Sequence, residues 1–158
     1  MNISSPHLLT DLEGPPEIEK LVNSFYVKVR ADETLGFIFD GIASVDWDAH
    51  LPKMYAFWEK VLFRTGSYTG NPLAIHARLL PLTEMGKPQF DRWLELFKQS
   101  VDELFCGPNA EHIKNCAADM ANVIYSRLNN VPNPGTDPAS LTAEQRARYA
   151  AYGRTAAV

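Results

Sequence analysis

The sequence is poor in cysteine. Only Cys106 and Cys116 occur among its 158 residues, with nine residues between them. This spacing matches no zinc-binding motif, and two cysteines do not make a disulfide framework. Both are therefore expected to be free thiols in a reducing cytoplasm.

Positive charge and long hydrophobic runs are also scarce. Fifteen lysines and arginines face nineteen acidic residues, which gives a formal net charge of −4, and no basic block is present. Nucleic acids and anionic membrane surfaces are therefore excluded as expected partners. No apolar stretch approaches the ~20 residues of a transmembrane helix. The N-terminal residues lack the cationic start and apolar run of a secretory signal, so we expect a cytoplasmic globular protein.

Aromatic residues, in contrast, are abundant, with 3 Trp, 6 Tyr and 8 Phe. Fourteen of these seventeen lie between Phe25 and Phe105. Aromatic side chains are large and rigid, and this density exceeds what a small helical core needs to fill its space. The composition favours a core that also encloses a flat apolar molecule.

The hydrophobic pattern of the first half is helical. Apolar residues recur at helical spacing over residues 18–29, directly after two prolines that favour a helix start. A loop over residues 32–34 and a short apolar run over 35–39 are expected to follow. The next helix is predicted to begin near Asp48, because Pro52 is comfortable only in a first turn.

Prolines and glycines divide the second half of the chain. A short helix is predicted over residues 73–80, which lie between two prolines. A third long helix is predicted to begin at Pro88 and to stop at Gly107. A fourth, capped by Asn109, is predicted to run to Leu128. No strand pattern competes with these helices, so the predicted fold class is all-α.

The chain is predicted to have three parts. Residues 1–14 form an N-terminal leader, residues 15–128 form the helical domain, and residues 129–158 form a Pro/Asn/Gly linker with a C-terminal tail. The tail contains a capping-box pattern that is compatible with a helix over about residues 143–152.

Four histidines are candidates for chemistry. His7 lies in the leader and His112 at a helix start, where solvated or capping roles are expected. His50 and His76 instead project from apolar helix faces. Taken singly, each is consistent with a core histidine that bonds a backbone carbonyl.

Two such histidines in one aromatic-rich core favour a bound metal as the partner of an imidazole nitrogen. A zinc site or a di-iron carboxylate site is not supported, because no Cys, Asp or Glu is placed nearby in the sequence. One imidazole beside an apolar slot suits haem, because haem iron brings its porphyrin nitrogens as further ligands.

Several segments together resemble the truncated haemoglobins, and group III most closely. They are LVNSFYVKVRAD around Tyr26, LGFIF, HLPKMYAFW from His50, NPLAIHARL around His76 and FDRWLELF around Trp93. Each motif is weak alone, but their order and spacing are specific. The resemblance extends from about Pro15 to Leu128.

This resemblance implies a two-over-two helical sandwich around one b-type haem. His76 would be the proximal iron ligand, and Tyr26, His50 and Trp93 would face the distal side. The haem pocket would be walled by Phe25, Phe39, Met54, Phe57, Trp58, Tyr68 and Phe90.

The implied function is reversible binding of oxygen, carbon monoxide and nitric oxide. The Tyr26 hydroxyl and the Trp93 indole N–H are expected to donate to bound oxygen, which carries partial negative charge. A hydrogen bond to a charged group contributes about 1.5–3 kcal/mol, so one donor would slow oxygen release roughly ten- to a hundredfold. His50 is expected to lie near its helix start and to act as a gate between pocket and solvent.

Two other functional classes stay open from the sequence. The first is a redox enzyme, either a nitric oxide dioxygenase or a peroxidase-like protein. It would need a separate reductase, because the chain has no flavin or nicotinamide motif. A peroxidase-like role would be promoted by a carboxylate beside His76. The second is a cofactor-free helical interaction domain.

Overall fold

The computed structural model describes residues 8–66, 68–77, 83, 85–133 and 143. These residues form helices and contain no strand. In chain order the elements are α1 (Pro15–Ala31), α2 (Glu33–Gly36), the π-helix η1 (Phe37–Ile42), α3 (Trp47–Phe63), α4 (Pro72–Ala77), α5 (Lys87–Leu104) and α6 (Pro108–Asn129).

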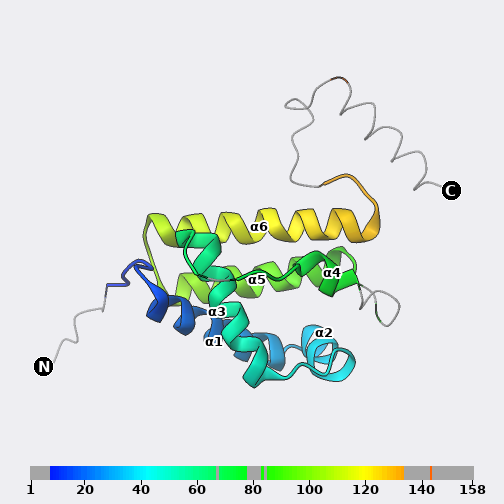
Figure 1. Ribbon diagram of the computed structural model, residues 1–158, viewed down its shortest axis with the longest axis horizontal. Helices are drawn as coiled ribbons and strands as arrows, with labels where there is room; N and C mark the ends of the chain where they lie inside the picture. Colours follow the sequence, from blue (N-terminus) through cyan, green and yellow to red (C-terminus); the bar gives the residue numbers. More distant parts are fainter. Residues whose placement is uncertain (1–7, 67, 78–82, 84, 134–142, 144–158) are drawn as a thin grey trace, which may run out of the picture.

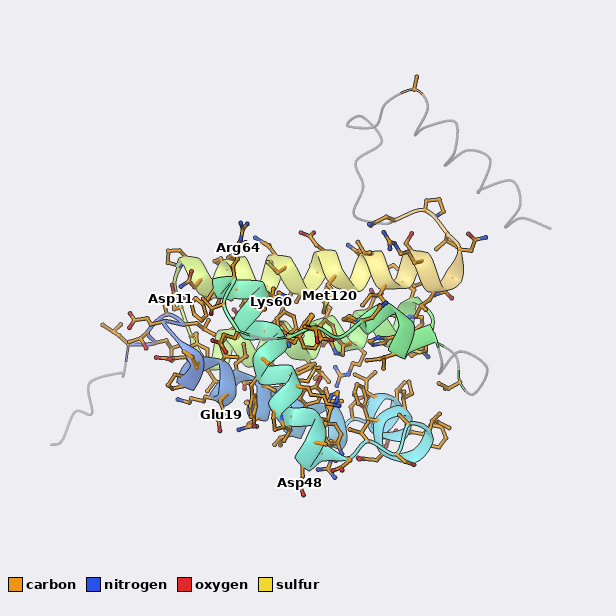
Figure 2. All side chains as sticks on the ribbon, in the orientation of Figure 1. Asp11, Glu19, Asp48, Lys60, Arg64 and Met120 are labelled. Carbon is orange, nitrogen blue, oxygen red and sulfur yellow. The ribbon has the colours of Figure 1, made fainter. Side chains whose placement is uncertain are left out.

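The four long helices form two layers (Figure 1). Helices α5 and α6 pack along one another, and α1 packs on both α3 and α5. Side chains from both layers extend into the space between them (Figure 2). The fully buried core includes Ile18, Leu21, Phe25, Trp58, Phe97 and Ile113. The described residues thus have the predicted all-α architecture.

Helix α1 follows the sequence pattern closely. Two prolines occupy its first turn, and its buried residues are those of the predicted apolar stripe, with Tyr26 added. The predicted loop over residues 32–34 is wrong, because α2 already begins at Glu33. The Asp32 carboxylate caps α2 by accepting from the Leu35 amide at 3.0 Å. It also accepts from Arg92 of α5 at 2.6 Å, so one side chain fixes both the turn and its place on the fold.

Helix α3 begins at Trp47, one residue before the predicted start, and is capped by Asp46. Pro52 therefore lies inside α3 as its sixth residue, so the prediction that it occupies the first turn was wrong. A proline at this position removes a single backbone hydrogen bond. Pro52 is solvent-exposed, so the carbonyl that it leaves free can bind water.

The N-terminal segment is fastened to the start of α6. Asn109 was predicted to cap this helix, but Gly107 is the capping position and carries no side chain for that role. Asp11 caps the helix instead, because its carboxylate accepts hydrogen bonds from the amides of Asn109 and Ala110 at 2.9 and 2.8 Å. Burial raises the pKa of the Asp11 carboxyl, but these backbone hydrogen bonds lower it, and the net shift is downward. The neighbouring Leu12 is fully buried in the core.

Two predicted helices extend beyond the described residues. The short helix predicted over residues 73–80 is present as α4 up to Ala77, and the remaining residues 78–80 lie outside the described part of the chain. The tail helix predicted over residues 143–152 also lies outside them, residue 143 excepted. Among the described helices, none combines the length and hydropathy needed to cross a membrane.

Candidate functional site

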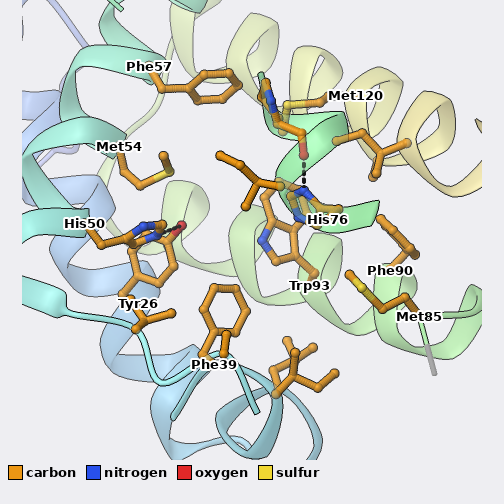
Figure 3. A pocket seen from close by; sticks show the side chains of 18 of the residues that line it. Tyr26, Phe39, His50, Met54, Phe57, His76, Met85, Phe90, Trp93 and Met120 are labelled. Atoms are coloured by element: carbon orange, nitrogen blue, oxygen red, sulfur yellow. Dashed lines mark hydrogen bonds between the residues drawn. The ribbon is translucent and has the colours of Figure 1, made fainter. Parts of the chain in front are cut away.

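One cavity of about 350 Å³ lies between the helix layers. It is lined by all the predicted site residues except Phe25, namely Tyr26, Phe39, His50, Met54, Phe57, Trp58, Tyr68, His76, Phe90 and Trp93. Its size is that of a small-molecule or cofactor site. Figure 3 shows His50 and Tyr26 at one side of the cavity and His76 at the other.

His76 reaches the cavity from the short helix α4. Its Nδ1 atom lies 2.6 Å from the carbonyl oxygen of Pro72, one turn earlier in the same helix (Figure 3). A carbonyl only accepts, so Nδ1 must carry the proton and donate it. The second ring nitrogen, Nε2, is then the unprotonated one in the neutral ring. An imidazole in this state, oriented by a carbonyl, has the form that a metal ligand requires.

Tyr26 and His50 form the polar part of the opposite wall. The Tyr26 hydroxyl lies 3.4 Å from His50 Nε2, and the two rings meet nearly edge-on, with centroids 5.4 Å apart. Burial raises the pKa of Tyr26, so the phenol stays protonated and can donate. Burial, with Lys53 and His76 nearby, lowers the pKa of His50 and favours its neutral ring.

Trp93 of α5 lines the cavity and belongs to a stack of aromatic rings. Its ring lies nearly parallel to that of Phe97, with centroids 5.6 Å apart, and stacks on Trp58 at 6.3 Å. Among the described residues, no acceptor binds its indole N–H. This donor is therefore available to a molecule inside the cavity.

Phe25 is the predicted wall residue that the structure places elsewhere. It is fully buried and packs edge-on against Trp93 and Phe97, at 5.5 and 5.2 Å, behind the cavity lining. Tyr26, the next residue along α1, takes the lining position. Neighbouring helical residues point about 100° apart, so only one of the two can face the cavity.

Sequence reasoning missed about half of the lining. These residues are Leu35, Ile38, Ala43, Val45, Pro72, Ile75, Met85, Gln89, Met120, Ala121 and Ile124. Most are aliphatic side chains whose pattern in the sequence is that of ordinary core residues. Met120 and Ile124 belong to the predicted fourth helix, but nothing in the sequence shows that they face a cavity.

The cavity fits a flat apolar group better than a metal ion held by side chains. Within the described part of the chain, no three His, Cys, Asp or Glu side chains come together as a metal site. The lining is instead aromatic and aliphatic, with one oriented imidazole on one side and two hydrogen-bonding side chains on the other. Haem matches this arrangement, because its iron needs only one protein nitrogen and its ring needs an apolar slot.

An all-α sandwich with an oriented histidine facing an aromatic pocket is the arrangement expected of a globin. A family model described as "Bacterial-like globin" matches residues 8–126. The curated "Group 3 truncated hemoglobin ctb" of Campylobacter jejuni is 36% identical over 119 residues, which cover 72% of this chain and 87% of that protein.

A solved structure is similar as well. The crystal structure of a group III truncated haemoglobin from Campylobacter jejuni matches with a TM-score of 0.68 and 31% identity, and the match covers 77% of this chain and 95% of that one. The chain belongs to the bacterial-like globins, a family of haem-binding proteins, and within them to the group III truncated haemoglobins.

Proposed function

We propose that the protein binds haem b through His76 and holds oxygen and other diatomic gases on the Tyr26 side of the cavity. The observation that carries the proposal is the state of the His76 ring. Its Nδ1 proton is committed to the Pro72 carbonyl, so Nε2 is the free ligand atom. The aromatic lining supplies the apolar slot for the porphyrin ring.

The opposite wall supports gas binding with slow release. When haem is bound, it supplies an iron that binds diatomic gases. The chain then contributes the donors. The Tyr26 hydroxyl is buried and protonated, and the Trp93 N–H lacks a partner among the described residues. Two donors favour oxygen that is held rather than delivered, which suits redox chemistry with nitric oxide better than transport.

The enzymatic alternative is a nitric oxide dioxygenase that depends on a separate reductase. The polar wall that holds oxygen is the observation in its favour. A peroxidase-like role has less support, because the partner of His76 is a backbone carbonyl instead of a carboxylate. A carbonyl makes the imidazole less electron-donating than a carboxylate does.

The proposal also places the protein in the cytoplasm, and two free thiols support this. Cys106 and Cys116 are both unpaired as disulfides and both reach the surface. Reduced cysteines are typical of a reducing compartment.

Ligand binding to the purified protein tests the proposed function. We expect the reduced protein to bind carbon monoxide and oxygen with a shift of an intense Soret band, and to release oxygen slowly. Nitric oxide consumption by the oxygen-loaded protein, with and without added reductase, then separates a dioxygenase from a simple binder. A protein that stays folded but neither carries nor takes up haem would contradict the proposal.

A further inference from the structure

Three residues outside the cavity lining form a network behind the polar wall. Trp47 is the first residue of α3, Asp40 lies in η1, and Arg30 lies in the last turn of α1. The Trp47 indole N–H donates to one Asp40 carboxylate oxygen at 2.7 Å. The Arg30 Nε lies 3.3 Å from the other oxygen, and its guanidinium carbon lies 4.8 Å from the centre of the Trp47 ring. The network therefore joins three helical elements at one point.

The ring of Trp47 contacts both polar side chains of the cavity wall. Its centroid lies 5.2 Å from that of Tyr26 and 5.6 Å from that of His50, which it meets edge-on at 87°. It also stacks on Phe39, with centroids 5.9 Å apart and an angle of 24°. Trp47 does not itself line the cavity. It touches the two polar residues without reaching a molecule bound between the walls.

The polar part of the network is exposed. The side chains of Arg30 and Asp40 are 51% and 41% exposed, and ion pairs at this exposure contribute little to stability. The role of Arg30 and Asp40 is therefore better explained by their contacts with Trp47, which fix the orientation of its ring. The hydrogen bond from Trp47, together with Arg30, lowers the pKa of the Asp40 carboxyl, so the acceptor stays ionised at neutral pH.

The π-helical backbone of η1 is a second indication that this network has a functional role. A π-helical turn is rare and is often found at functional sites. Here it presents Ile38 and Phe39 to the cavity and Asp40 to Trp47. One short segment thereby contributes both to the cavity wall and to the contact behind it.

We infer that Trp47, fixed by Asp40, is a positioning residue that holds the Tyr26 hydroxyl and the His50 imidazole in one arrangement. The inference rests on the proposed function, since it concerns the side chains that would face a bound gas. His50 lies only three residues after Trp47, in the first turn of α3. Without the bond to Asp40, the indole can rotate, His50 loses its edge contact, and its ring can turn between cavity and solvent.

Infrared spectroscopy of the haem-loaded protein with carbon monoxide as the probe tests this inference. The C–O stretching frequency depends on the local field, so one donor arrangement gives one band and several arrangements give several. We expect one dominant band for the parent and an additional band for both Asp40→Ala and Trp47→Phe. The double variant should match Trp47→Phe, because both changes break the same bond and their effects do not add.

The rate of gas binding gives a second readout. If His50 spends a large part of its time turned away from the cavity, carbon monoxide association should rise about threefold in Asp40→Ala. Asp102→Ala is the matched control, because it removes another exposed aspartate from an ion pair, with Lys114, at the far end of α5. Its band and its rate should equal those of the parent.

Three results would overturn the inference. An unchanged single band in Asp40→Ala and Trp47→Phe, with haem still bound, would show that Trp47 does not position the donors, and the proposed function would stand. An equal change in Asp102→Ala would show a general loosening of the fold. A parent protein that takes up no haem would refute the proposed function and the inference with it.

Discussion

Replacing Tyr26 by phenylalanine tests the polar wall of the cavity, because the change removes one hydroxyl and keeps the ring. That hydroxyl belongs to a side chain only 6% exposed, and its 3.4 Å contact with His50 is too long for a strong hydrogen bond. It is therefore available to a gas molecule that carries partial negative charge. Such a bond contributes about 1.5–3 kcal/mol, so its loss should speed oxygen release roughly ten- to a hundredfold.

Stopped-flow measurement of oxygen dissociation from the reduced, haem-loaded protein gives this rate directly. Tyr55→Phe is the matched control, because the Tyr55 hydroxyl donates to Asn23 of α1 and Tyr55 does not line the cavity. We expect fast release from Tyr26→Phe and an almost unchanged rate from Tyr55→Phe. Equal rates for Tyr26→Phe and the parent would show that the buried hydroxyl donates no hydrogen bond to bound oxygen.

Three further predictions concern the scaffold that builds the site. Asp11→Ala should lower the free energy of unfolding at neutral pH by about 1–2 kcal/mol, because two amides of the first turn of α6 lose their acceptor. The pKa of this carboxyl is lowered in the folded state, so the parent's advantage should be complete at neutral pH and should vanish as the pH falls through that lowered pKa. Trp58→Ala should cost about 3–5 kcal/mol in urea unfolding, because Trp58 is 1% exposed and stacks on Phe97. Gly36→Ala should cost about 1–3 kcal/mol and lower the thermal midpoint, since a Cβ there would lie 2.6 Å from the Arg30 carbonyl oxygen.

Each of these has a result that contradicts it. The Asp11→Ala prediction is contradicted if the loss of stability persists unchanged in acid, where the Asp11 carboxyl is protonated in both the folded and the unfolded state. For Trp58→Ala it is a loss below about 1 kcal/mol, typical of a surface site. For Gly36→Ala it is a thermal midpoint equal to that of the parent, which would mean that α1 and α2 separate easily.

The helices could be predicted from the sequence because their causes are local. The apolar spacing in α1 and the prolines that begin α1, α5 and α6 act within a few residues of where they stand. His76 could be singled out for the same reason, as an imidazole on a short helix that begins at a proline. The same local reasoning failed at Pro52, because a helix capped one turn earlier tolerates one missing hydrogen bond on its exposed side.

Contacts between distant residues could not be predicted in this way. Nothing local connects Asp11 with Asn109 in the first turn of α6, 98 positions later, or Asp32 with Arg92, 60 positions later. Phe25 shows the same limit on a smaller scale. Periodicity marks it as buried, but whether it faces the cavity or the aromatic stack depends on where α5 lies.

In the proposed function, His76 holds the haem and His50 faces it from the other side of the cavity. Haemin titration of the parent, His76→Ala and His50→Ala, followed at the Soret band before and after reduction, tests it most directly. We expect a histidine-ligated spectrum for the parent and for His50→Ala, and its loss or a marked change for His76→Ala. The opposite pattern, with ligation kept in His76→Ala and lost in His50→Ala, would contradict it.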